Sequence, residues 1–169
     1  MKRAWFLFIS LAVVLADQLT KLAIRRSFVE YESVPVLGNL LRLTYIQNTG
    51  AAFSFSPGSP MFNRFFFSAV SLIAIIVLIW VVVHARQTLP ALCYSLIIGG
   101  AAGNLIDRLR LGGVTDFLDA DFPDFIMQRW PVFNLADSAI VVAIILLLIY
   151  TLFFERKHTS GDADHENPA

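Results

Sequence analysis

Four long apolar runs dominate the pattern of hydrophobic and polar positions along the chain. A helix needs about 20 apolar residues to cross the hydrocarbon core of a bilayer, and each run is close to that length. The pattern therefore predicts four transmembrane helices, at about 4–24, 62–85, 89–109 and 133–154. Because only residues 86–88 separate the second run from the third, these two helices are expected to form an antiparallel hairpin.

The first run has a second interpretation, a cleavable secretory signal. Basic residues precede it, and the small-residue pattern at 14–16 resembles a cleavage site. The apolar run nevertheless continues through 22–24, and Asp17 and Lys21 would make little sense at a discarded boundary. We therefore expect a retained transmembrane helix.

The segment 25–61, between the first two helices, is too long for a simple connector. Within it, 34–39 has the composition of a turn. The stretch 40–47 is partly alternating and rich in β-branched and aromatic residues, which favours a short β-strand. Residues 48–50 then read as a turn that ends the strand.

Composition supports a membrane protein and excludes several other classes. Of the 169 residues, 57% are hydrophobic and 15% are charged, whereas soluble domains are about a quarter charged. The length suits one domain. The formal net charge is zero, so there is no electrostatic basis for binding nucleic acid. The single cysteine, Cys93, excludes an internal disulfide. The polar tail 155–169 is expected to be disordered.

Polar residues lie at one end of the first, third and fourth runs. In alternating helices these ends fall on the same side of the membrane. Ionisable groups at this depth cost several kcal/mol unless they are paired or hydrated, so they are functional candidates. The candidates are Asp17, Lys21, Asn104, Asp107, Arg108, Asn134 and Asp137, together with Asp116 in the loop 110–132.

Several candidates have a simpler structural interpretation. Asp17 and Lys21 are four residues apart on one helix face and are expected to form a structural ion pair. Asn104, Asp107 and Arg108 share a face of the third helix, in a stretch whose small residues permit close helix packing. Asp107 alone is more simply explained as an interhelical hydrogen-bonding group.

Asp116 and Asp137 are expected at the same membrane face. The helix dipole favours an aspartate at the position of Asp137, but it does not explain Asp116. If the two carboxyl groups meet, they cannot both ionise freely and will share a proton. The ionised group can then activate water while the protonated group polarises a carbonyl. Because His84, His158 and His165 lie toward the opposite side or in the tails, and no ligand spacing suggests zinc, aspartic chemistry is the only hydrolytic option.

A proton- or ion-coupled small membrane transporter is the alternative function. Such a protein is expected to carry polar residues at mid-membrane and internal repeats. Here the polar residues crowd one end, and the run 62–85 is almost entirely apolar. The balance of Lys and Arg does not decide the orientation in the membrane, although four helices place both termini on one side.

Five ordered blocks of the sequence resemble the lipoprotein signal peptidases (signal peptidase II), which are bacterial intramembrane aspartic peptidases. The blocks are Asp17-Gln18-Leu19-Thr20-Lys21, Asn48-Thr49-Gly50-Ala51-Ala52-Phe53, 99–108, Val114-Thr115-Asp116-Phe117 and Phe133-Asn134-Leu135-Ala136-Asp137-Ser138. The resemblance covers nearly the whole chain. It implies an all-α membrane protein of four transmembrane helices, an extracytoplasmic β-cradle from 25–61 and a flap at 118–131.

The resemblance also implies roles for individual residues. Asp116 and Asp137 match the catalytic pair. The other motif positions, expected around the active site, are Asp17, Lys21, Asn48, Gly50, Asn104, Asp107, Arg108, Asn134 and Ala136. The implied substrate is a prolipoprotein whose Cys carries diacylglycerol, cut just before that Cys. No metal or other cofactor is implied. We expect a monomer in contact with membrane lipid in the bacterial inner membrane, with cytoplasmic termini and an extracytoplasmic active site.

Overall fold

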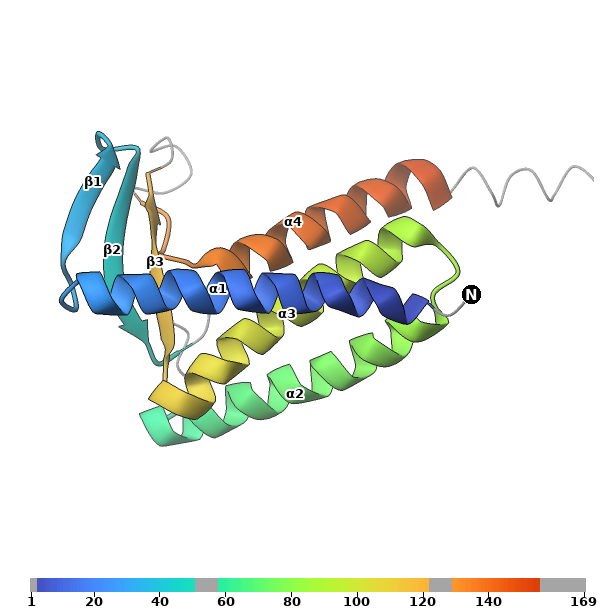
Figure 1. Cartoon of the computed structure of the whole chain (residues 1–169), viewed down its shortest axis with the longest axis horizontal. Coiled ribbons are helices and arrows are strands. Elements are labelled where there is room, and N and C mark those ends of the chain that lie inside the picture. Colours follow the sequence, from blue (N-terminus) through green and yellow to red (C-terminus); the bar gives the residue numbers. More distant parts are fainter. Residues whose placement is uncertain (1–2, 51–57, 122–128, 156–169) are drawn as a thin grey trace, which may run out of the picture.

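Four long helices run side by side, and a small sheet stands across one end of them (Figure 1). The computed structural model describes residues 3–50, 58–121 and 129–155. In this part of the chain the long helices are α1 (Leu7–Ser27), α2 (Pro60–His84), α3 (Thr88–Leu111) and α4 (Leu135–Tyr150). A 3₁₀ turn at Arg3–Phe6 precedes α1, and a π-helical turn at Thr151–Glu155 follows α4.

The predicted membrane helices are confirmed, because all four are long and apolar enough to span a bilayer. Their ends differ from the prediction by a few residues, for local reasons. The hydroxyl of Ser59 accepts a hydrogen bond from the N–H of Phe62, so α2 begins at Pro60. Gly112, with φ of 83°, ends α3 in the left-handed conformation that glycine tolerates. The last helix begins at Leu135, later than predicted, because Asn134 caps it.

The helix α3 lies at the centre of the bundle and contacts the other three long helices (Figure 1). Its glycines permit this close packing. A Cβ on Gly99 would lie 2.7 Å from Cβ of Val13 in α1, and one on Gly103 would lie 2.5 Å from Oδ2 of Asp17. A Cβ on Gly100 would collide with the carbonyl oxygen of Ala136 in α4. The predicted close approach of helices at small residues is therefore confirmed.

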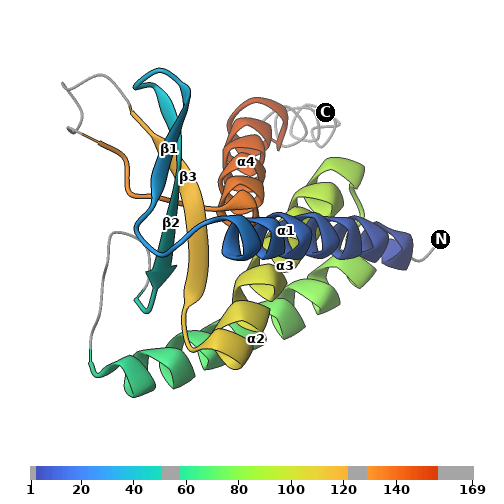
Figure 2. The ribbon, with the colours of Figure 1, turned by 60° about the vertical axis from the view of Figure 1, so that its left-hand side comes forward.

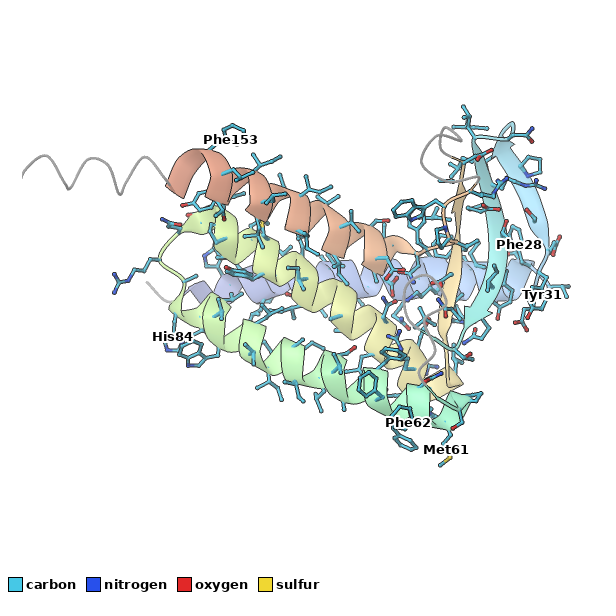
Figure 3. The ribbon with its side chains drawn as sticks, turned by 180° about the vertical axis from the view of Figure 1, so that it is seen from behind. Phe28, Tyr31, Met61, Phe62, His84 and Phe153 are labelled. Carbon is cyan, nitrogen blue, oxygen red and sulfur yellow. The ribbon has the colours of Figure 1, made fainter. Side chains whose placement is uncertain are left out.

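Large apolar side chains cover the outside of the bundle. Phe65 and Ile73 of α2 are 60% and 62% exposed, and Ile144 and Leu148 of α4 are 53% and 58% exposed. Such surfaces are unfavourable in water but suit contact with lipid tails. Oxygen and nitrogen atoms instead gather at the sheet end of the helices (Figure 3).

The sheet contains three antiparallel strands in the order β1 (Ser33–Leu37), β2 (Leu41–Asn48) and β3 (Val114–Ala120). The predicted strand at 40–47 is confirmed as β2. The predicted turn at 34–39 is wrong for its first part, because β1 extends to Leu37 and pairs with β2. The chain actually turns at Gly38, whose φ is +53°.

The third strand was not predicted, and it changes the two expected loop assignments. β3 pairs with the open edge of β2, so the sheet is built from two separate parts of the chain, whereas the expected cradle used 25–61 alone. Residues 118–120 of the expected flap belong to β3, and 122–128 lie outside the described residues. The expected tail also lies outside them from residue 156 onward.

The sheet stands at the end where α1 and α3 finish and α4 begins (Figure 2). The predicted clustering of these three polar helix ends is therefore confirmed. The connection between α2 and α3 lies at the opposite end, where His84 is found (Figure 3). α2 and α3 form the expected antiparallel hairpin.

Candidate active site

The first helix supplies a buried ion pair. Asp17 and Lys21 are fully buried, and Nζ of Lys21 lies 2.9 Å from Oδ2 of Asp17, which confirms the predicted pair. Lys21 also donates a 2.8 Å hydrogen bond to Oδ1 of Asn104 and lies 3.4 Å from Oδ2 of Asp107. Oδ1 of Asp17 accepts the backbone N–H of Ala136 at 3.1 Å. The pair therefore connects α1 to both α3 and α4.

Asp107 of α3 is a junction between helices and sheet. The amide of Gln18 donates to its Oδ1 at 3.1 Å, and Nη1 of Arg25 lies 3.7 Å from the same oxygen. Its Oδ2 accepts the backbone N–H of Thr115 in β3 at 3.0 Å. Asp107 therefore does more than link helices by hydrogen bonds, because it also binds the strand that carries Asp116.

Arg108 faces the end of β2. Its Nη2 donates to the carbonyl oxygen of Gly50 at 3.3 Å, and its guanidinium lies 5.4 Å from the centre of the Phe67 ring. The N–H of Gly50 donates to Oδ1 of Asn48 at 2.9 Å. Arg108 therefore fixes the chain immediately after the strand that carries Asn48.

Asn134 lies at the centre of the site. A short backbone bridge places it there, because Phe133 exchanges hydrogen bonds with Leu118 of β3. The Asn134 side chain is fully buried. Its Nδ2 donates to Oδ1 of Asp116 at 2.6 Å and to Oδ1 of Asn104 at 3.1 Å. Its Oδ1 accepts the backbone N–H of Asp137 at 2.9 Å.

Both candidate residues, Asp116 and Asp137, are thus hydrogen-bonded to Asn134. Asp137 forms a capping box with it, since Oδ2 of Asp137 accepts the Asn134 backbone N–H at 3.2 Å. Oδ1 of Asp137 accepts from Nδ2 of Asn104 at 2.7 Å. Oδ2 of Asp116 accepts from Nδ2 of Asn48 at 3.0 Å. Each carboxyl group is therefore held by two neutral amide donors.

The environment of Asp116 favours its protonated form. Asp116 is 3% exposed, and burial is the main reason that its pKa is raised from an ordinary value of 3.8 to about 7. The negative charge of Asp137 contributes to this rise, and the hydrogen bonds from Asn48 and Asn134 oppose it. A carboxyl group with a pKa near neutrality is suited to hold or release a proton during catalysis.

All the expected site residues lie in one cluster of helix ends and strands. Ala136 takes part through its backbone N–H, and Gly50 through its backbone alone. Within the described residues, no group of three or more His, Cys, Asp or Glu side chains is arranged to hold a metal ion.

Sequence reasoning missed two contributors to the cluster. Arg25 follows Asp17 and Lys21 at helical spacing, so a polar stripe on α1 was available as a signal for it. Thr115 is fully buried, and its hydroxyl accepts from Nη1 of Arg25 at 2.8 Å. Nothing in the sequence apart from its place next to Asp116 indicated this role.

Known proteins are similar to this chain in both sequence and fold. A lipoprotein signal peptidase of Geobacter metallireducens is 41% identical over 159 residues, covering 93% of this chain and 96% of the relative. One from Moorella thermoacetica is 44% identical over 143 residues, covering 84% and 89%. A solved structure described as a bacterial membrane enzyme, at 2.3 Å, matches with a TM-score of 0.80 and 30% identity, covering 100% of this chain and 99% of that one.

A second solved bacterial membrane enzyme matches with a TM-score of 0.76 and 31% identity, covering 88% of this chain and 93% of the other. The family model described as signal peptidase (SPase) II matches residues 9–153, which include every residue of the cluster. This chain is therefore a peptidase that belongs to the signal peptidase II family.

Proposed function

We propose that this protein removes signal peptides from diacylglyceryl-modified prolipoproteins, and that Asp116 and Asp137 carry out the hydrolysis. The observation that carries the proposal is the arrangement around Asn134. One buried side chain hydrogen-bonds to Asp116 and caps the helix turn that contains Asp137. The two carboxyl groups are therefore held by the same asparagine, where the sheet meets the helix ends.

The charged side chains around Asn134 favour one proton shared by Asp116 and Asp137. The cluster contains four carboxyl groups and three basic side chains, namely Asp17, Asp107, Asp116, Asp137, Lys21, Arg25 and Arg108. If all seven are ionised, one negative charge is left over in a largely buried site, which is costly. One proton on the Asp116–Asp137 pair makes the cluster neutral.

Of the two residues, Asp116 is the better suited to be protonated. Burial and the charge of Asp137 raise its pKa to about 7, so it is about half protonated at neutral pH and largely protonated below it. Asp137 is the better anion. It lies in the first turn of α4, where the helix dipole favours negative charge, and it accepts hydrogen bonds from Asn104 and Asn134.

This division of protons supplies the two functions that peptide hydrolysis needs. Ionised Asp137 takes a proton from the attacking water as a general base. Protonated Asp116 donates a hydrogen bond to the scissile carbonyl oxygen and stabilises the negative charge that develops there. The C–N bond then breaks as the proton that Asp137 took from water passes to the leaving amine, and Asp116 is left protonated as at the start. Asn48, Asn104 and Asn134 hold both carboxyl groups in place throughout.

The position of the site at one end of four membrane helices fits a lipid-anchored substrate. A diacylglyceryl chain holds the substrate Cys at the membrane surface, and cleavage just before that Cys leaves the lipid on the product. We place both termini in the cytoplasm and the sheet at the extracytoplasmic face of the bacterial inner membrane. We further propose that the enzyme works as a monomer surrounded by lipid.

Cleavage of one purified prolipoprotein, in lipidated and unlipidated forms, tests the proposal. The wild-type enzyme should cut the lipidated form just before Cys and leave the other intact. Asp116→Asn and Asp137→Asn should each lower the rate by at least about 10²–10⁴-fold, the usual contribution of general acid–base catalysis. Asparagine still accepts one hydrogen bond at each position, so both variants should fold.

Asp121→Asn is the matched control. This aspartate follows the same strand but lies 4.0 Å from Nη1 of Arg129 and not in the central cluster, so its replacement should leave the rate unchanged. Near-normal turnover by either Asp116→Asn or Asp137→Asn would refute the catalytic assignment. Equal cutting of both substrate forms would refute the role of the lipid.

A further inference from the structure

Thr115 is held from two directions immediately before Asp116. Its side chain is fully buried. Its backbone N–H donates to Oδ2 of Asp107 at 3.0 Å, and its hydroxyl accepts from Nη1 of Arg25 at 2.8 Å. Thr115 is therefore attached to α3 through its backbone and to α1 through its side chain.

Arg25 makes this attachment from the last turn of α1. Its side chain is 18% exposed, and its Nη1 also lies 3.7 Å from Oδ1 of Asp107. The same nitrogen thus faces both Thr115 and the carboxyl group that holds the Thr115 backbone. Arg25, Asp107 and Thr115 form a closed three-way contact that joins α1, α3 and β3.

The attachment matters because pairing within the sheet is irregular at this place. The register of β2 against β3 shifts between Leu43 and Ile46, opposite the segment from Asp116 to Leu118. An irregular ladder fixes the direction of a strand less firmly than a regular one. The helices supply the missing constraint through Thr115.

Fixing Thr115 also fixes Asp116, since neighbouring side chains of a strand point to opposite faces. When Thr115 is held against Arg25, Asp116 is directed to the other face, where Asn48 and Asn134 receive it. Rotation of the strand would move both side chains together. A displacement of about 1 Å at a reacting group is enough to lower a rate by about 100-fold.

We propose that Arg25 and Thr115 are a positioning pair that sets the orientation of Asp116, an inference that rests on the proposed function of Asp116. The competing explanation is that Arg25 is only a basic residue at the C-terminal end of a helix, where the helix dipole favours positive charge. Arg26, the exposed neighbour in the same turn, has that same general advantage. It provides a matched control.

The test measures kcat and KM on a synthetic prolipoprotein with a diacylglyceryl Cys, using the full-length enzyme in detergent. Arg25→Met and Thr115→Val should each lower kcat roughly 10- to 100-fold and leave KM within about twofold. The double variant should be no slower than the slower single variant, because each change breaks the same contact. Thr115→Ser keeps the hydroxyl and should restore wild-type kcat, and Arg26→Met should match wild type.

Three results would overturn the inference. These are wild-type kcat in both Arg25→Met and Thr115→Val, an equal loss in Arg26→Met, and fully additive losses in the double variant. Asp116→Asn, run in the same assay, separates this inference from the proposed function. Full activity of Asp116→Asn refutes the proposed function itself. If Asp116→Asn is inactive while Arg25→Met and Thr115→Val are both fully active, only the positioning pair is refuted. If Arg25→Met does not fold, the comparison of Thr115→Val with Thr115→Ser decides.

Discussion

Replacing Asp116 by Asn should make the protein more stable at alkaline pH while removing its activity. The wild-type carboxyl group is buried beside the charge of Asp137, and these two effects raise its pKa from 3.8 to about 7. In the unfolded chain the same group ionises near its ordinary value. Above about pH 4 the folded state therefore binds a proton that the unfolded state releases, and the stability contributed by protonated Asp116 is lost as pH rises toward 7.

The size of this effect follows from the difference between the two pKa values. At about 1.4 kcal/mol per pKa unit, a rise from 3.8 to about 7 corresponds to a total cost of about 4 kcal/mol above pH 7. About 2–3 kcal/mol of that cost accumulates between pH 5 and pH 8. An asparagine does not titrate, so Asp116→Asn escapes this loss entirely.

The substitution carries a cost of its own that does not depend on pH. Asp116 accepts hydrogen bonds from Nδ2 of Asn134 and Nδ2 of Asn48. The single oxygen of asparagine can accept only one of these directly, and its amide then faces the other donor, at a cost of about 1–3 kcal/mol. The pH dependence of the difference between variant and wild type is therefore more informative than the difference at one pH.

Thermal unfolding of both proteins in one detergent, at intervals from pH 5 to pH 8, measures this dependence. Relative to wild type, the midpoint of Asp116→Asn should rise steadily with pH. Asp121→Asn, changed in the same way at a site away from the cluster, should stay parallel to wild type. If the curves of Asp116→Asn and wild type are also parallel from pH 5 to pH 8, Asp116 does not have a raised pKa.

Three further outcomes are expected from the same structure. The rate of cleavage should fall about tenfold per pH unit above about pH 7, as Asp116 loses its proton; a rate that stays constant to pH 9 would contradict this. Lys21→Met leaves Asp17 and Asp107 buried without their shared cation, so it should destabilise the fold by about 3–5 kcal/mol in unfolding experiments. Addition of Asp17→Asn should recover part of that loss, and no recovery would argue against the pairing. Gly100→Ala places a methyl group against the carbonyl of Ala136 and should cost about 1–3 kcal/mol; unchanged stability and cleavage would show that α3 and α4 do not pack this closely.

The parts of the fold that depend on local pattern could be predicted from the sequence. A membrane helix requires a long apolar run, so the four helices followed from the position of those runs. The Asp17–Lys21 pair followed from spacing of four residues on one helix. The alternation of helices then placed the polar ends together, without any knowledge of distances.

The sheet was harder to predict because it depends on pairing between distant segments. The Val-Pro-Val pattern of β1 resembles a turn, and it becomes a strand only because β2 lies beside it. β3 likewise follows from the open edge of β2 and from the bridge to Phe133. Long-range contacts of this kind leave little local signal.

The position of Asn134 between the carboxyl groups was also beyond the reach of sequence patterns. The spacing of Asn134 and Asp137 predicted that they lie on the first turn of one helix. It did not show that the amide of Asn134 would reach Asp116, because this requires the bridge between Phe133 and Leu118. The resemblance to signal peptidase II indicated which residues surround the site, and the structure supplies their contacts.

The hydrogen bond between Asp17 and Ala136 has a consequence for the biosynthesis of the enzyme. Asp17 lies in α1, which is synthesised before α4, the helix that contains Ala136. The start of α4, and with it Asp137, acquires its full set of hydrogen bonds only when these two helices meet in the membrane. Before α4 packs, Asp17 lacks the N–H of Ala136 and Asn104 lacks the carboxyl group of Asp137 as partners. The hydrogen bonds around Asp137 are therefore completed only when α4 packs against α1 and α3.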